Sequence, residues 1–209
     1  MAKRSKDTLT GGTGDVNPQY ASIGVFTPAI PGGGSASAVA PIVLPVLPNL
    51  GGTQDTAQVV ELLKVVWDAG GQPQVTTPPQ LYSTTSVRLA FNSVTAGSAV
   101  TSTSIQGTIA NPLIIDEVSV VQQSLQEVAA AGGSYAFAFQ TAHNLQTDLT
   151  DGAGHGILVA VPTIWFGVSV SGWPAGGVAF GAARVFYRLK RVKLIEYIGI
   201  VQQQSGPQI

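Results

Sequence analysis

VAFGAARVFYRLKRVKLIEYIGIV, residues 178–201, is the longest stretch of strand-type sequence in this chain. It is rich in valine, isoleucine, phenylalanine and tyrosine, which suit a pleated and half-buried surface. Its side chains also alternate, because Val192, Leu194, Glu196, Ile198 and Ile200 share one parity, and a period of two predicts a strand. We therefore expect one long strand here, or two strands that meet at 190–191, with the other strands arranged around it.

The same stretch contains five of the chain's ten basic residues, namely Arg184, Arg188, Lys190, Arg191 and Lys193. In a flat strand the first three lie on one face and the last two on the other, and a bend near Lys190 would reunite them. A basic patch attracts phosphate groups without reading base sequence, so these residues are candidates for nucleic-acid contact. An ordinary solvated strand end, or an interface paired with acidic side chains, is the alternative interpretation.

The composition of the chain is unusually low in charge. Charged residues make up 10% of its 209 residues, whereas about 25% is typical. A surface made of Gln, Thr, Ser, Asn and Gly gains little solubility from charge and is weakly protected against association. Two explanations remain open: much of the surface is buried between copies of the chain, or the chain is an extracellular β-sandwich with a Ser/Thr-rich surface.

The N-terminal segment differs from the rest of the chain. Lys3, Arg4 and Lys6 are basic, and residues 7–19 are polar and glycine-rich, which predicts an arm that is flexible when free. The remainder is net acidic, and such a segregation of charge suits a protein with one face toward a polyanion. No apolar run approaches the ~20 residues of a membrane span, and no apolar core follows the basic start as in a signal peptide.

Short strands separated by glycine and proline turns are expected along the rest of the chain. One stretch, 112–131, favours a helix by periodicity, because Val118, Val121, Leu125 and Val128 share a helical face. A count of eight or more strands and at most one helix predicts an antiparallel sandwich or barrel. The expected strands are 20–26, 38–47 (an edge strand or an extended segment, since it contains two prolines), 58–67 (for which a helix is the alternative), 84–92, 134–141, 156–161 and 164–170.

Residues that carry catalytic chemistry are scarce. The chain has two histidines and no cysteine, and it contains neither a Gly-x-Ser-x-Gly elbow nor a phosphate-binding loop. Asp151 and His155 could touch across a tight glycine loop, but a metal site needs three or four ligands. Asp116 and Glu117 are adjacent, so in a strand they point to opposite faces. We expect no enzyme activity, no metal site and no cofactor.

Four stretches, spread from the N-terminus to near the C-terminus, resemble a known family. They are KRSKDTLTGGTGDVNPQ (3–19), VELLKV (60–65), LTDGAGHGILVA (149–160) and YRLKRVKLIEYIGIVQ (187–202). In these stretches the chain resembles the capsid proteins of small, circular, Rep-encoding single-stranded DNA viruses, in the unclassified group known from environmental and faecal samples. The segments between them are divergent.

The resemblance implies a single eight-stranded antiparallel jelly roll at 20–209 with a short N-terminal arm at 1–19. It also implies self-assembly into an icosahedral shell of about 60 copies that encloses viral single-stranded DNA. The location would be the virion, with assembly in the host cell and the nucleus as a candidate compartment, and entry would use a host receptor. It makes 59–67 a strand and favours a strand over a helix at 116–128.

The DNA contacts would be non-specific and made by eight basic residues. Many relatives carry a long arginine-rich arm, whereas this chain has only three basic residues there, so encapsidation depends on the C-terminal cluster or genome binding is weak. The eight residues are Lys3, Arg4, Lys6, Arg184, Arg188, Lys190, Arg191 and Lys193.

A second hypothesis, from a different class, is a secreted or surface β-sandwich that acts as a lectin-like binding module. Its site would be formed by the glycine-containing loops at 152–156 and 171–177. The absence of a recognisable signal peptide counts against this hypothesis.

Overall fold

The computed structural model describes residues 18–30, 34–48, 56–72, 83–97, 111–128, 134–139, 145–172 and 176–205. The predicted N-terminal arm, with Lys3, Arg4 and Lys6, lies outside these residues except for its last two positions. Among the described residues, no helix is long and apolar enough to cross a membrane.

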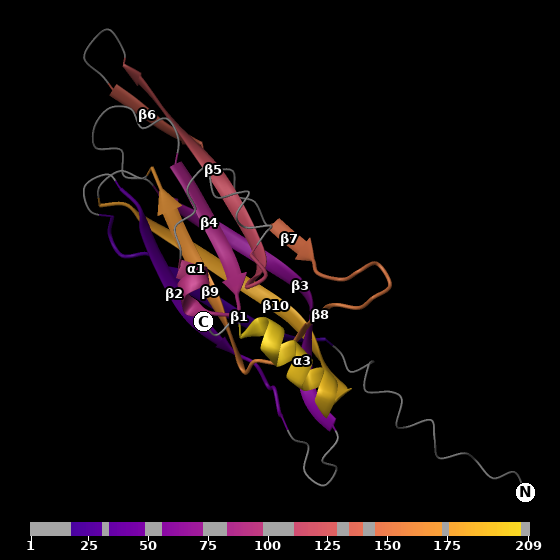
Figure 1. Ribbon diagram of the computed structural model, residues 1–209. Coiled ribbons are helices and arrows are strands. Elements are labelled where there is room, and N and C mark those ends of the chain that lie inside the picture. Colours follow the sequence, from indigo (N-terminus) through magenta and orange to yellow (C-terminus); the bar gives the residue numbers. More distant parts are fainter. Residues whose placement is uncertain are drawn as a thin grey trace, which may run out of the picture.

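Two antiparallel sheets form a sandwich, so the predicted all-β fold is confirmed (Figure 1). The first sheet, called sheet A, has the strand order β1-β10-β3-β7, with β8 also paired to β3, and the second, sheet B, has the order β2-β9-β4-β5-β6. The strands of sheet A are β1 (Gln19–Phe26), β3 (Thr56–Gln72), β7 (Leu145–Asp148), β8 (Ile157–Val159) and β10 (Val178–Lys193). Those of sheet B are β2 (Ala36–Val43), β4 (Ser83–Ala90), β5 (Ile114–Val128), β6 (Ser134–Phe139) and β9 (Thr163–Ser171).

The order in which the strands enter the two sheets is that of a jelly roll. The chain crosses from β1 in sheet A to β2 in sheet B and back to β3, and later passes from β8 to β9 and to β10 in the same alternating way. Two Greek keys wound together in this manner define the jelly-roll sandwich. The resemblance implies eight strands, whereas the described residues form ten. The two additional strands arise because β7 and β8 both pair with the same edge of β3, and because β6 extends sheet B beyond β5.

The core lies between the inner faces of the two sheets. Trp67 and Phe166 are fully buried there, with their ring centroids 6.3 Å apart. The indole N–H of Trp67 donates to Asp116 Oδ2 at 3.1 Å and to Thr147 Oγ1 at 3.2 Å, so its one polar group is paired. The prediction of a strand in 58–67 is confirmed by β3, whose alternating side chains supply much of this core.

The predicted strand at 178–201 is only partly correct. β10 ends at Lys193, and residues Leu194–Gln204 form the helix α3. Among the described residues, the β10–β3 ladder ends where Lys193 lies opposite Thr56, the first residue of β3. A helix instead brings Tyr197, Ile200 and Val201 onto one face, which packs against Ala57, Val59, Ala160 and Val192 on the outer side of sheet A.

The helix favoured by periodicity at 112–131 is wrong, because Ile114–Val128 is β5. Val118 pairs with Val87 and Val120 with Thr85 across the antiparallel β4–β5 ladder, and Val120 is buried. The hydrophobic residues of this stretch fit both the three-to-four spacing of a helix and the period of two of a strand. Pairing with β4 stabilises the strand. The expected edge strand is confirmed, since β2, which contains Pro41, lies at the margin of sheet B.

The outer face of sheet B is covered by the short helix α1 (Ser93–Gly97). Arg88 is 5% exposed and donates through Nε to Glu117 Oε2 at 2.9 Å and through its NH1 group to the carbonyl of Thr95 in this helix at 2.7 Å. Asp116 and Glu117 therefore do point to opposite faces, one toward Trp67 in the core and the other toward Arg88.

Candidate functional site

The predicted C-terminal basic cluster lies on β10, the strand between β1 and β3 in sheet A. Arg184, Arg188 and Lys190 share the outer face, while Arg191 and Lys193 have the other parity. β10 is one continuous strand, and its register shift lies at Phe186/Tyr187 rather than near Lys190. The bend that would reunite the five residues is therefore not found, and they divide into separate groups.

Arg188 and Lys190 converge on a buried carboxylate. The side chain of Glu61, on the neighbouring strand β3, is 0% exposed. It accepts hydrogen bonds from Arg188 Nε and, at 3.5 Å, from Lys190 Nζ. The backbone N–H of Gly156 donates to the same carboxylate at 3.0 Å. A buried charge is tolerated when it is paired and hydrogen-bonded in this way, so these two basic residues have a structural role.

The environment of Glu61 keeps the carboxylate ionised. Burial on its own raises the pKa of Glu61, but the hydrogen bonds from Arg188 and Gly156 and the charges of Lys190 and Arg188 outweigh it. The net result is a pKa below the ordinary value. The group therefore carries its negative charge at neutral pH and offsets part of the positive charge of the cluster.

The loop at 149–156 is attached to this ion-pair group. Arg188 donates from its NH2 group to the carbonyl of Gly154 at 2.9 Å. Within the loop, Asp151 accepts the N–H groups of Ala153 and His155 and contacts His155 Nδ1 at 3.2 Å. The predicted contact between Asp151 and His155 is thus confirmed. Gly152 and Gly154 have φ values of 80° and 87°, which are left-handed conformations that glycine adopts without strain.

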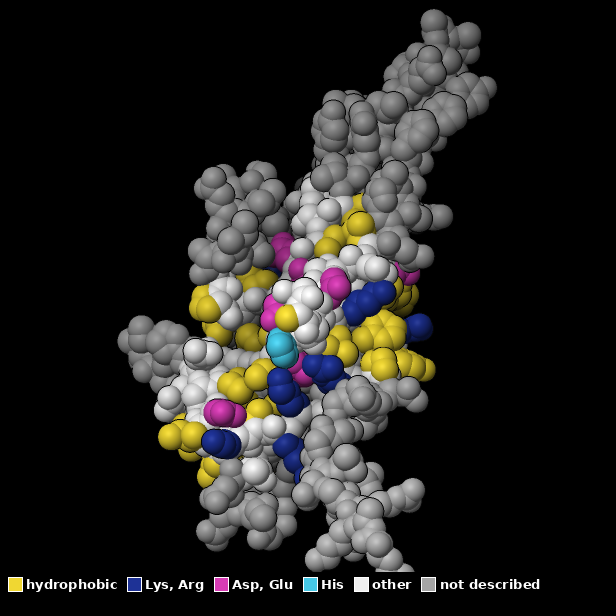
Figure 2. All heavy atoms as spheres, turned by 90° about the vertical axis from the view of Figure 1, so that its right-hand side faces the viewer, with side chains coloured by type: hydrophobic (Ala, Val, Ile, Leu, Met, Phe, Trp, Pro, Cys, Tyr) yellow, Lys and Arg dark blue, Asp and Glu magenta, His cyan; other side chains and the backbone are white. Residues whose placement is uncertain are grey.

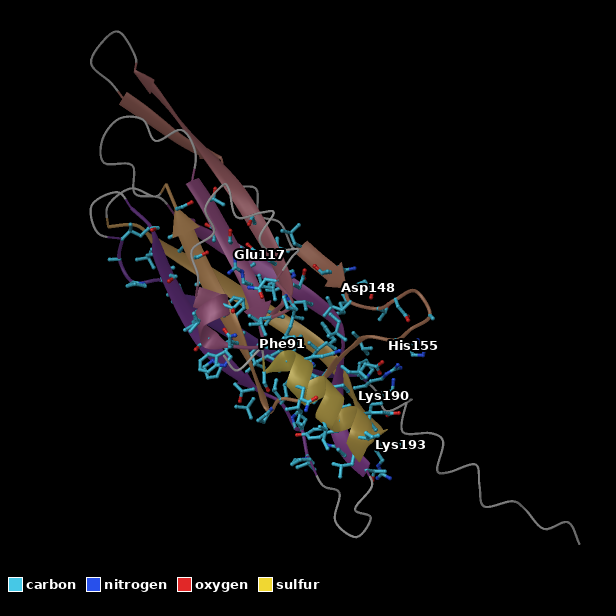
Figure 3. All side chains as sticks on the ribbon, in the orientation of Figure 1. Phe91, Glu117, Asp148, His155, Lys190 and Lys193 are labelled. Carbon is cyan, nitrogen blue, oxygen red and sulfur yellow. The ribbon has the colours of Figure 1, made fainter. Side chains whose placement is uncertain are left out.

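Acidic and basic side chains alternate over the outer face of sheet A (Figure 2). Lys64 stands opposite Asp148 in the β3–β7 ladder, and its charge contributes to lowering the pKa of Asp148, after the hydrogen bonds from Thr150. Asp148, His155, Lys190 and Lys193 lie along the same side of the molecule in Figure 3. The face is therefore of mixed charge rather than uniformly basic.

Arg184 has different surroundings. It lies over the ring of Tyr20, with its guanidinium carbon 5.3 Å from the ring centroid, and its Nε donates to Ser22 Oγ at 3.3 Å. Tyr20 is 62% exposed, so a cation and an aromatic face are presented together to solvent. An open hollow beside them is lined by Ser22, Asp68, Gln146 and Arg184, among other residues.

Arg191 and Lys193 occupy the end of β10 and the start of α3, and both are exposed. Neither makes an ion pair within the part of the chain that the structure describes. The structure thus places the C-terminal basic residues in three environments: beside Tyr20, around Glu61, and at the start of α3.

Sequence reasoning missed two residues that define this face. Glu61 lies in the expected strand 58–67, but nothing in the sequence indicated which cations it would meet. Tyr20 stands within an expected strand, and its exposure follows from the position of β1 at the edge of sheet A. Tyr187 and Tyr197, the tyrosines near the C-terminal basic residues, pack in or against the core.

The two loops proposed for a lectin-like site are far apart. The 149–156 loop leads into β8, which pairs with Leu62 of β3, whereas the turn before β10 lies next to Gln72. The ten residues of β3 between these points span about 33 Å at the usual rise per residue. The two loops therefore do not form one site. The described residues also contain no group of three or more His, Asp or Glu that could hold a metal ion.

Large hydrophobic side chains are exposed on three parts of the surface. The first is the β1 edge with the start of β10, the second is β2 with the following segment and α1, and the third is α3. They are Tyr20, Phe26 and Val178 on the first, Val39, Val43, Leu47 and Val94 on the second, and Leu194, Ile195 and Ile198 on the third. Exposed apolar side chains that lie together, unlike single scattered ones, often mark interaction sites, so these surfaces are candidates for contact with other chains.

Comparison with known proteins finds no matching family and no curated protein that matches in sequence. Among solved structures, VP1 of Merkel cell polyomavirus in complex with disialyllactose is similar over 83% of this chain and 96% of its own, with 13% identity and a TM-score of 0.40. VP1 of trichodysplasia spinulosa-associated polyomavirus in complex with GM1 oligosaccharide gives 13% identity, 83% and 94% coverage and a TM-score of 0.42. The subunit of the Merkel cell polyomavirus virus-like particle has 14% identity and a TM-score of 0.41, and the similarity covers 93% of this chain and 82% of its own.

Proposed function

We propose that this chain is a viral coat subunit that self-assembles into a closed icosahedral shell. The observation that carries the proposal is a jelly roll of low charge whose two sheet edges and C-terminal helix expose large hydrophobic side chains. Each of these surfaces is small, and many weak contacts between copies close a symmetric shell where a single contact would not hold a stable dimer. The protein acts through geometry rather than chemistry.

The enclosed genome in this proposal is circular single-stranded DNA, as the motif resemblance implies, and about 60 copies form the shell. Lys3, Arg4 and Lys6 neutralise phosphate non-specifically. Of the C-terminal residues, Arg184 is the best suited to DNA, because Tyr20 beside it offers a ring on which a base can stack. Arg188 and Lys190 are engaged by Glu61 and contribute less.

The small number of cations sets an expectation for the role of salt. Few phosphate contacts release few counterions, so shell formation depends weakly on ionic strength compared with a coat that has an arginine-rich arm. Particle yield is therefore expected to change by less than about tenfold between low and moderate salt. A collapse of the yield over that range would contradict this part of the proposal.

Electron microscopy of the purified chain, with nuclease treatment and DNA extraction, tests the proposal. Uniform closed particles that protect single-stranded DNA from nuclease are the expected result. Closed particles that hold no DNA and have the ultraviolet spectrum of protein alone would support the coat assignment but contradict the assignment of a DNA genome. A monodisperse monomer at high concentration, with no closed particles under any salt condition, would overturn the coat.

A further inference from the structure

The outer side of α3 carries an apolar stripe with a glycine in the middle. Ile195 is 78% exposed and Ile198 is 48% exposed. Together with Gly199 and Gln202 they have the spacing i, i+3, i+4 and i+7, which places them along one side of a helix. The opposite side, with Tyr197, Ile200 and Val201, already packs against sheet A, so Ile195 and Ile198 stay exposed and line an open hollow with Thr56 and Lys193.

Within the part of the subunit that the structure describes, no contact requires a glycine at position 199. A Cβ atom built at this position would meet no atom within 4 Å, so neither packing nor conformation calls for glycine here. Glycine inside a helix is unfavourable relative to alanine because it loses more backbone freedom on folding. A glycine next to the exposed Ile198 allows a second helix to approach closely, since no side chain at that position separates the two backbones.

The charges near α3 favour one orientation of that second helix. Glu196 in the first turn caps the positive end of the helix dipole and accepts the backbone N–H of Lys193 at 3.3 Å, but Arg191 and Lys193 leave a net positive charge there, and the last turn contains no basic residue. In an antiparallel pair the cations of each copy lie beside the negative end of the other helix. The same arrangement places Ile198 of one copy against Gly199 of the other when the two-fold axis passes near these residues.

We propose that α3 packs antiparallel against α3 of a second copy of this chain about a two-fold axis near Ile198 and Gly199. The contact is isologous, because the same stripe serves both copies. An 11-residue helix is about 16 Å long. It cannot supply the roughly 800 Å² per partner of a stable interface, so the contact is weak alone. Most copies make this contact only when the other contacts of a shell hold them together, and in this respect the inference rests on the proposed function.

Single-cysteine cross-linking tests this contact directly, because the chain has no cysteine of its own. Ile198→Cys places one thiol near the axis, where two Cα atoms come within the ~7 Å that a disulfide allows. Ala153→Cys, at an exposed alanine in the 149–156 loop and outside the three apolar surfaces, is the matched control. After mild oxidation of concentrated protein, most Ile198→Cys chains are expected to run as disulfide-linked dimers, while Ala153→Cys chains remain monomeric.

The outcomes separate this inference from the coat assignment. Because a disulfide traps even a weakly populated contact, dimers with Ile198→Cys but not with Ala153→Cys support the helix pair, whether or not closed particles form. Closed particles whose Ile198→Cys chains stay unlinked would overturn the helix pair and leave the coat intact, because another segment or partner would then cover the stripe. Equal linking of both variants, or neither linking nor particles, would also overturn it.

A variant that introduces a charge provides a second readout without cysteine. Ile198→Glu changes an exposed side chain, so the subunit should keep the thermal unfolding of the unchanged chain, while like charges meet across the axis. Particle yield is expected to fall at least about tenfold, because the repulsion recurs at every two-fold contact of the shell. Ala153→Glu, at an exposed position outside the apolar surfaces, should leave the yield unchanged, and an unchanged yield with Ile198→Glu would contradict the proposal.

Discussion

Gln204 of α3 occupies the position that a neighbouring strand would take beside Ala160. Its Oε1 accepts the backbone N–H of Ala160 at 2.9 Å, and its Nε2 donates to the carbonyl of Leu158. One amide side chain thus satisfies both polar groups at the outer edge of β8, whose other edge pairs with β3. The side chain fixes the end of α3 to sheet A and blocks a strand edge that would otherwise be open to other chains.

Gln204→Ala should destabilise the subunit by about 2 kcal/mol, because two backbone groups beneath α3 lose their partner. Hydrogen exchange measures the effect locally, and the amide of Ala160 should exchange much faster in the variant. Gln203→Ala, at the exposed neighbouring position, is the control and should change stability by less than about 0.5 kcal/mol. Unchanged protection of Ala160 in Gln204→Ala would show that the side chain does not hold the helix.

Arg188→Met should lower the free energy of unfolding of the subunit by about 2 kcal/mol, because it leaves the buried Glu61 carboxylate with only the more distant Lys190 as a cation. Urea unfolding of the dissociated subunit measures this change. Arg184→Met is the matched control on the same face of the same strand, and its exposed side chain predicts an effect below about 0.5 kcal/mol. Equal effects of the two substitutions would contradict the structural role of the Glu61 ion pairs.

Acid should weaken the subunit through Glu61. The folded state lowers the pKa of Glu61, so the stabilisation is present above its ordinary value of 4.5 and is lost as the pH falls through the lower folded value. Asp148 and Asp151 act in the same direction, since hydrogen bonds within their loop also lower the pKa of each. Unfolding free energies measured from about pH 6 to pH 3 should therefore decrease.

The variant Glu61→Gln shows how much of the pH dependence of stability comes from Glu61. It should be less stable than the unchanged chain at neutral pH, because Arg188 and Lys190 lose their carboxylate, and its stability should fall less steeply with acid. If both proteins gave the same slope of stability against pH, Glu61 would not be the group responsible.

Gly199→Ala should have opposite effects on the subunit and on its association. The isolated subunit should gain about 0.5–1 kcal/mol, because alanine is the better helix former and its Cβ meets empty space. Association through α3 should weaken, because the added methyl group holds the two backbones apart. Calorimetry and light scattering on the same sample measure both effects. A gain in stability with undiminished association would leave Gly199 without a role in contact.

The sequence predicted the sandwich because the strands that define it, β3, β4 and β9, are dense in β-branched residues and bounded by turn residues. It failed where local pattern and pairing disagree. Residues 194–201 have both a period of two and an i, i+3, i+4 stripe, and the outcome depends on whether β3 extends far enough to pair them. Residues 114–128 have the same two spacings, but they form a strand because β4 pairs with them.

The candidate site was only partly predictable. The parity of β10 correctly divided Arg184, Arg188 and Lys190 from Arg191 and Lys193. The partners of these residues come from β1 and β3, which are separated from β10 by more than a hundred residues, and a single sequence does not report such pairings. Thus the neutralisation by Glu61 and the stacking on Tyr20 became visible only in the folded chain.

The mass of the species that the purified chain forms in solution tests the central claim most directly. The claim that this jelly roll covers its exposed apolar surfaces with copies of itself predicts a narrow distribution near 60 times the 21.4 kDa subunit mass. Multi-angle light scattering after size exclusion provides this value. A single species at 21.4 kDa that persists at high protein concentration would contradict the claim.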